Sequence, residues 1–150
     1  MMAKRILVPL SMTAPADSFV TAVGDLARGA GGTVRLLHVA PPTEHVTDID
    51  GRLVAYADQE AARLDTEARD YLETIALALD GMPVELAVRF GDPAREILAE
   101  AADFGADLIA LGLGRRRQRC LPGRVASHVL RRASTPVVLF RAGCHESGER

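Results

Sequence analysis

The sequence predicts an α/β domain with a parallel, doubly wound sheet and helices on both faces of that sheet. Apolar runs of strand length alternate with helical stretches along the chain, and this alternation is typical of parallel sheets. The apolar runs are continuous, as expected for strands that are covered on both faces. The 150 residues show no internal repeat and no linker, so we expect a single domain.

Each expected strand is a short run rich in Val, Leu and Ile. The expected strands are residues 5–10, 33–39, 84–88, 107–111 and 136–140. Helical periodicity and turn residues bound the elements between them. The expected helices are residues 13–30, 52–79, 93–104 and 122–133, and residues 43–50 are expected to form a polar loop. Asp92 and Pro93 predict a sharp helix start, because Asp is a preferred N-cap and Pro suits the first turn.

The longest helix carries an apolar stripe at spacings of three and four residues. Such a stripe also fits a coiled coil, but its many alanines favour packing against a sheet. We expect no membrane insertion, because no apolar run approaches the ~18 residues that a transmembrane helix needs. Cys120 and Cys144 lie far apart without metal-ligand spacing. They are expected to be free thiols in a reducing, cytoplasmic setting.

Charge is distributed unevenly along the chain. Residues 1–107 carry 9 basic and 18 acidic side chains, whereas residues 108–145 carry 8 arginines and no acid. This asymmetry predicts a positively charged face. The arginine-rich stretch 115–119 contains no aromatic residue, and the sequence pI is near 6.1. Nucleic-acid binding is therefore not expected.

Five segments, taken in order, resemble the universal stress protein family. They are Ile6–Pro9, Leu36–Val39, Gly91–Ile97, Gly105–Ile109 and Val125–Val138. The resemblance implies a Rossmann-like, adenine-nucleotide α-hydrolase-like sheet of five strands in the order 3-2-1-4-5. We expect the domain to span residues 1–141 and residues 142–150 to form a flexible polar tail. The resemblance also implies a homodimer paired through residues 136–140.

The resemblance further implies a nucleotide site where the first and fourth strands diverge, with ATP and Mg²⁺ as the expected ligands. The candidate residues lie at strand ends and at the start of the last helix. They are Pro9, Leu10, Ser11, Val39, Leu111, Gly112, Gly114, Gly123, Arg124 and Val125.

Two departures from the family's ATP-binding pattern bear on this site. That pattern is Gly-x-x-Gly, nine residues, then Gly followed by Ser or Thr. Here Gly123 stands at the third glycine and Arg124 at the hydroxyl position. The gap from Gly112 to Gly123 is two residues shorter than the pattern, and Gly114 fits the second glycine only with a shifted register. Ser11 stands where ATP-binding members place an Asp.

Arg124 leaves two alternatives open. The helix dipole disfavours a cation at a helix start, and a bound phosphate would relieve that cost through bidentate hydrogen bonds. Alternatively, Arg124 folds into the phosphate pocket and replaces the ligand. The leading hypothesis is a dimeric stress-response module that binds ATP or another phosphate ligand and acts through an unknown regulatory protein partner.

The alternatives are a ligand-free dimeric interaction module and a slow ATPase. The sequence shows no Walker lysine, no metal-binding carboxylate pair near the loop and no evident general base. We therefore assign no catalytic residue and no metal ligand. His38 lies within an apolar strand and is expected to be a structural, hydrogen-bonded histidine.

Overall fold

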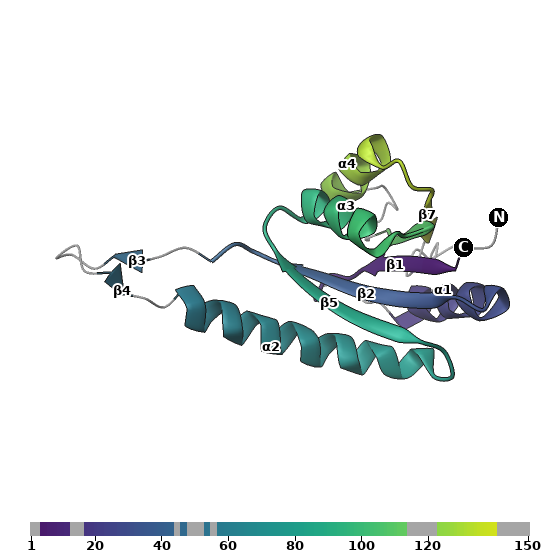
Figure 1. Ribbon diagram of the computed structural model, residues 1–150, viewed down its shortest axis with the longest axis horizontal. Coiled ribbons are helices and arrows are strands. Elements are labelled where there is room, and N and C mark those ends of the chain that lie inside the picture. Colours follow the sequence, from purple (N-terminus) through teal and green to yellow (C-terminus); the bar gives the residue numbers. More distant parts are fainter. Residues whose placement is uncertain are drawn as a thin grey trace, which may run out of the picture.

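The computed structural model describes residues 4–12, 17–43, 46–47, 53–54, 57–113 and 123–140. Five parallel strands form the main sheet (Figure 1). They are β1 (Arg5–Pro9), β2 (Thr33–Ala40), β5 (Val84–Phe90), β6 (Leu108–Gly112) and β7 (Val137–Phe140). Their spatial order is β5-β2-β1-β6-β7. Counted by position in the chain, this is 3-2-1-4-5, and the predicted fold class is confirmed.

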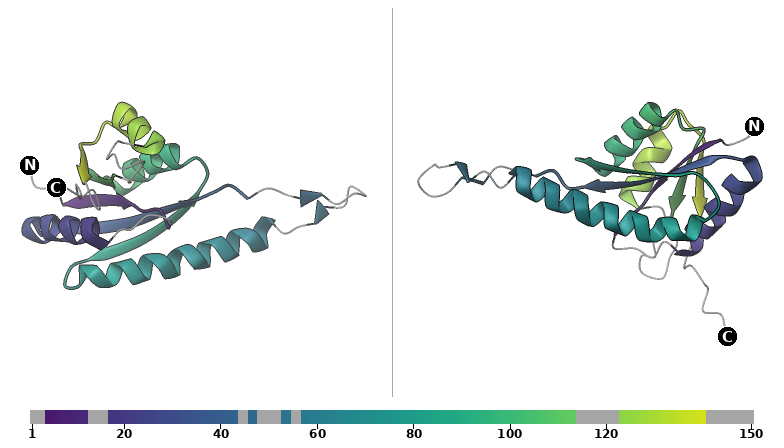
Figure 2. Two further views of the ribbon diagram at one scale, coloured as in Figure 1. Left: turned by 180° about the vertical axis from the view of Figure 1, so that it is seen from behind. Right: turned by 60° about the horizontal axis from the view of Figure 1, so that its bottom comes forward.

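Helices cover both faces of the sheet (Figures 1 and 2). Helices α1 (Asp17–Ala30) and α2 (Ala57–Ala76), together with the 3₁₀ turn η1 (Leu77–Leu79), pack on one face. Helices α3 (Pro93–Phe104) and α4 (Arg124–Arg132) pack on the other. The core has two clusters: the first lies between the sheet and α1, α2 and η1, and the second lies between the sheet and α3 and α4. Along β1, Ile6 and Val8 belong to the first cluster and Leu7 belongs to the second. Burial on both faces explains why the strands are continuously apolar.

The ends of α3 follow from its sequence as predicted. The side chain of Asp92 accepts a hydrogen bond from the Arg95 amide at 3.1 Å, which satisfies an N–H of the first turn. Gly105 closes the helix with φ 68°, in the left-handed region that glycine adopts without a Cβ clash. Asp107 then accepts hydrogen bonds from the amides of Lys4 and Arg5, and it ties the start of β6 to the start of β1.

The segment after β2 differs from the prediction. A two-stranded antiparallel hairpin, β3 (Val46–Thr47) with β4 (Leu53–Val54), replaces part of the expected polar loop and the first turn of the expected long helix. Helix α2 begins only at Ala57, and its last predicted turn is 3₁₀. The error has a clear origin, because Leu53 continues the four-residue spacing of the apolar stripe although it belongs to a strand. The hairpin projects well beyond the main sheet (Figure 1).

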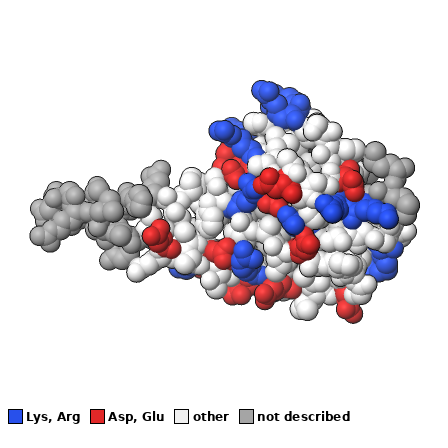
Figure 3. All heavy atoms as spheres, in the orientation of Figure 1, with Lys and Arg blue, Asp and Glu red and all other residues white. Residues whose placement is uncertain are grey.

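Several predictions from the sequence fall outside the described residues. They concern the start of the first helix at residues 13–16, Gly114, the arginines at 115–119, both cysteines and the tail 142–150. In the part of the chain that is described, no helix is long and apolar enough to span a membrane. On the face shown in Figure 3, acidic and basic side chains are interspersed, and the basic groups at its top lie over α4.

Candidate nucleotide site

The expected site lies at the carboxyl edge of the sheet, where the chain leaves β1 and β6. These strands are direct neighbours, with Ile6 opposite Leu108 and Leu7 opposite Ile109. The connection from β1 runs to β2 on one side, whereas β6 continues to β7 on the other. The helices after the two strands therefore cover opposite faces, and ligands of open α/β sheets bind where the connections diverge in this way.

The backbone that follows β1 is held by two side chains. The Leu10 amide donates to the Leu37 carbonyl at 2.7 Å. The Leu10 carbonyl lies 3.0 Å from Nδ1 of His38, and the Ser11 carbonyl accepts a hydrogen bond from the Tyr71 hydroxyl at 3.1 Å. Because a carbonyl only accepts, the proton of the His38 contact resides on Nδ1. The expectation of a structural, hydrogen-bonded His38 is confirmed, and the two side chains position the backbone at this edge.

Tyr71 was not recognised in the sequence as part of this edge. Its place on the apolar stripe of α2 marked it only as a core residue, and the ring does pack against the first core cluster. The phenolic hydroxyl is the feature that distinguishes it from the other members of that stripe, because buried tyrosines usually direct this group to a hydrogen-bond acceptor.

Gly112 ends β6 directly beneath Phe19 of α1. A Cβ at this position would lie 2.9 Å from Cε1 and 3.0 Å from Cδ1 of Phe19. The Phe19 ring is buried and also packs on Phe140, with ring centroids 6.0 Å apart. Packing between α1 and β6 therefore accounts for Gly112 without any ligand.

Gly123 has a different role from Gly112. It is the N-cap of α4 in an extended conformation, with φ −74° and ψ −178°, and no side chain caps the helix. Among the described residues, no atom lies within 4 Å of a Cβ built on Gly123. Neither backbone strain nor packing against a described residue requires glycine here. The amides of the first turn of α4 lack intrahelical partners, as at any helix start, and carry its partial positive charge.

The remaining predicted residues divide into core and surface positions. Val39 packs against the same core cluster as Leu111, so their side chains belong to the α3–α4 face of the sheet. Arg124 and Val125 are exposed on the first turn of α4. Gly114 is not among the described residues. In the described parts of the chain, no group of three His, Cys, Asp or Glu side chains is placed to hold a metal ion.

A sheet of this order, with helices on both faces and a glycine-led helix at its carboxyl edge, is the architecture that the resemblance implied. The family model described as the universal stress protein family matches residues 2–141. The chain belongs to the universal stress protein family. Universal stress protein G of Shigella flexneri is 30% identical over 113 residues, which cover 73% of this chain and 78% of that protein. The protein of the same name from Escherichia coli O157:H7 matches to the same extent.

Solved structures show the same fold. Hypothetical protein MJ0577 superposes with a TM-score of 0.75 at 24% identity, covering 93% of this universal stress protein and 96% of the other chain. A universal stress protein solved in complex with cAMP gives a TM-score of 0.65 at 16% identity, covering 93% and 98% of the two chains. One from Archaeoglobus fulgidus, solved with dAMP, gives 0.64 at 19% identity, covering 94% and 100%.

Proposed function

We propose that this universal stress protein binds an adenine nucleotide at the carboxyl edge of β1 and β6, with its phosphates at the N-terminus of α4. The observation that carries the proposal is Gly123. In the part of the chain that the structure describes, neither packing nor backbone conformation requires glycine at this position, and the close approach of a ligand to the backbone would explain it. Amides at a helix start are suited to a phosphate through their hydrogen bonds and through the helix dipole.

The family supports an adenine nucleotide in particular, because two structural neighbours were solved with cAMP and with dAMP. ATP with Mg²⁺ is the ligand that we propose for this chain. Ser11 offers a weaker acceptor than the Asp of ATP-binding members, so we expect the phosphate end to contribute much of the affinity. The protein then acts as a cytoplasmic regulatory module, and nucleotide occupancy biases its contacts with a partner protein.

Arg124 is the residue through which this chain departs most from the family pattern, and it provides the direct test. Arg124→Ala is expected to weaken ATP binding by at least ~1.5 kcal/mol, about tenfold, because a charge-assisted hydrogen bond to phosphate is lost. Calorimetric titration of ATP with Mg²⁺ into exhaustively dialysed protein measures the change. Arg131→Ala is the matched control, because Arg131 is exposed on the last turn of the same helix.

The outcomes separate the alternatives. Equal weakening by both substitutions would indicate a general charge effect and no direct contact. Absence of binding to the wild-type protein, together with no nucleotide released on denaturation, would favour the ligand-free module. Protein-dependent phosphate release would favour the slow ATPase, provided that Arg124→Ala also lowers it.

We propose that the protein forms a homodimer through β7. This strand is at the edge of the sheet, and Val138 is 37% exposed. The amide of Ile109 donates to the Pro136 carbonyl and that of Leu113 to the Phe140 carbonyl. Because backbone groups of successive strand residues point to opposite sides, Val137 and Leu139 direct their amides to the open edge. No strand of the described residues pairs with this edge, and such an edge is a template for a second strand.

Val137→Pro is expected to weaken the dimer, because it removes one outward amide from the seam. A proline at Val138 is a poorer test, because that amide faces β6 and its loss would disturb the sheet itself. Sedimentation over a range of protein concentrations measures association. Val137→Thr keeps both the amide and the branched shape and serves as the control, and a Val137→Pro protein as dimeric as this control would exclude a β7 seam.

A further inference from the structure

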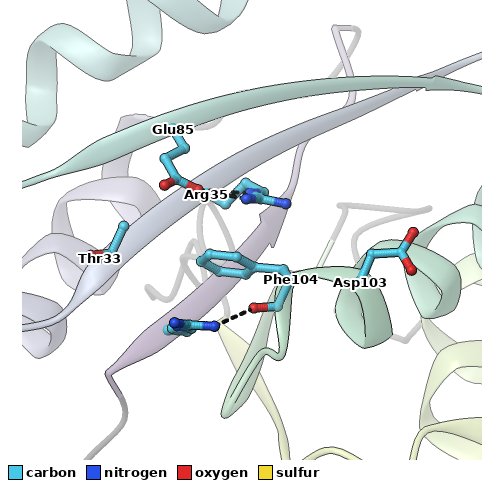
Figure 4. A pocket seen from close by; sticks show the side chains of 6 residues that line it. Thr33, Arg35, Glu85, Asp103 and Phe104 are labelled. Atoms are coloured by element: carbon cyan, nitrogen blue, oxygen red, sulfur yellow. Dashed lines mark hydrogen bonds and ion pairs between the residues drawn. The ribbon is translucent and has the colours of Figure 1, made fainter.

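A pocket of about 280 Å³ lies at the end of the sheet opposite the nucleotide site (Figure 4). Its lining comes from the starts of three strands and the end of α3. The lining residues are Arg5, Thr33, Arg35, Glu85, Asp103 and Phe104. Because the strands are parallel, this amino-terminal edge is separated from the carboxyl edge by the length of the strands. The pocket therefore forms no part of the proposed nucleotide site.

The Phe104 ring organises the pocket. It is 6% exposed, and the guanidinium of Arg35 stacks over it at 4.0 Å from the centroid. The guanidinium of Arg5 lies 5.9 Å from the same centroid, and its Nη1 donates to the Phe104 carbonyl at 3.0 Å. Figure 4 shows Arg35 between Glu85 and this ring. Cation–π contacts and hydrogen bonds thus hold both arginines in fixed positions.

Some hydrogen-bond donors and some acceptors of the pocket lining have no partner among the described residues. Glu85 accepts two hydrogen bonds from Arg35, both at Oε1, and Asp103 accepts from Arg89 at Oδ2. Within the described residues, the second oxygen of each carboxylate accepts no hydrogen bond, and the Thr33 hydroxyl has no partner. Arg5 forms no ion pair with any described carboxylate, and it retains N–H donors at Nε and Nη2.

These groups are separated across the pocket. Arg5 and Thr33 are opposite each other on β1 and β2, and Glu85 is on β5, beyond β2. Two strand spacings, about 10 Å, separate the backbones of β1 and β5. The four charged lining residues comprise two arginines and two carboxylates, so the lining has no net charge. A simple anion would meet the free carboxylate oxygens, and a simple cation would meet Arg5. Electrostatic complementarity therefore favours a neutral ligand that carries both charges.

We propose that this pocket binds a small zwitterion of the amino-acid class. The carboxylate of the ligand accepts hydrogen bonds from Arg5 and Thr33, and its ammonium group donates to Glu85, whereas the Asp103 carboxylate points away from these groups and pairs with Arg89. Arg35 remains paired with Glu85 and forms the base of the pocket with Phe104. The proposal is independent of nucleotide binding, so either can fail without the other.

The test is a titration of the ¹⁵N-labelled full chain with glycine and L-serine, followed by amide chemical shifts. We expect saturable shifts centred on the amides of Thr33, Glu85 and Phe104. Sodium acetate and ethylamine, each carrying one of the two charges, are expected to bind at least about tenfold more weakly, since each loses one set of charge-assisted hydrogen bonds. Equal binding of acetate would overturn the proposal in favour of a plain oxyanion site, and equal binding of ethylamine would overturn it in favour of a cation site.

Two variants locate the binding. Arg5→Gln and Glu85→Gln are each expected to weaken glycine binding about tenfold or more. Glu85 is 49% exposed at its side chain, so the second variant is expected to fold even if the first does not. Arg69→Gln is the matched control, because Arg69 pairs with Asp65 on α2, away from the pocket. No saturable shift with either amino acid at tens of millimolar, or equal weakening by Arg69→Gln, would overturn the proposal.

Discussion

Glu100→Gln is expected to lower the free energy of unfolding by about 3 kcal/mol. The Glu100 side chain is 8% exposed on the sheet-facing side of α3. It accepts from Arg35 Nη1 at 2.5 Å and from Arg89 Nε at 2.7 Å. Glutamine keeps the shape but loses the charge, and its amide group turns a donor toward one of the two arginines. Two partly buried guanidinium groups would then lack their shared counter-ion.

The cost is large because Glu100 joins three elements. Arg35 belongs to β2 and Arg89 to β5, and these two strands meet α3 only on this face of the sheet. Arg89 also donates to Glu96 and Asp103 of the same helix. These other pairs are more exposed than Glu100 and contribute less, because solvent screens them. Glu100 is thus the centre of the network.

The pH dependence of stability provides an independent readout of the same prediction. Burial alone would raise the pKa of Glu100, but the hydrogen bonds from Arg89 and Arg35 outweigh it, and the pKa lies below its ordinary value. A carboxylate whose pKa is lowered by folding stabilises the protein above its unfolded-state pKa, and this stabilisation is lost as the pH falls through the folded-state pKa. We therefore expect a shallower loss of stability on acidification in Glu100→Gln than in wild type.

Urea unfolding at neutral and acidic pH, at one fixed protein concentration, measures both effects. Glu73→Gln on α2 is the matched control, because Glu73 is exposed and forms no ion pair or hydrogen bond with a described residue. Losses of the same size in both variants, or acid titrations of the same steepness, would contradict the role assigned to Glu100.

The sequence contained a signal for the burial of Glu100, although this burial was not predicted. Ile97, Ala101 and Phe104 define the buried face of α3. Glu100 lies three residues after Ile97 and four before Phe104, so helical geometry places it on that face. What could not be read from the sequence is its pairing, because Arg35 and Arg89 come from strands 65 and 11 residues away. Ion pairs between distant segments depend on the sheet register.

The fold itself was predictable because its signals are local. Continuous apolar runs, the Asp92 cap and Gly105 each mark an element through backbone chemistry that acts within a few residues. The hairpin of β3 and β4 was missed because two-residue strands carry too little pattern to compete with an adjacent helical stripe. The sheet edge that carries the candidate site was predictable, whereas the contacts of His38 and Tyr71 with the backbone after β1 depend on tertiary packing.

The glycines of the candidate site show this limit most clearly, since the sequence gives Gly112 and Gly123 the same role in phosphate binding. The structure separates them. A Cβ would meet the Phe19 ring at Gly112 and no described atom within 4 Å at Gly123. Contact with Phe19 therefore explains the glycine at position 112. No described contact explains the glycine at position 123, which is why we propose a ligand there.

Gly112→Ala is accordingly expected to lower the free energy of unfolding by about 2 kcal/mol, the usual cost of overpacking a core. The Phe19 ring cannot yield freely, because it is buried and packs on Phe140. Gly123→Ser is expected to leave stability unchanged or slightly higher, since the φ of Gly123 is negative and serine is a preferred N-cap.

A double-mutant cycle of Gly112→Ala with Phe19→Leu, measured by urea unfolding, identifies the cause of the loss at Gly112. If the clash with Phe19 is responsible, the cost of Gly112→Ala falls in the Phe19→Leu background. Additive losses would show that the cost has a cause other than contact with Phe19.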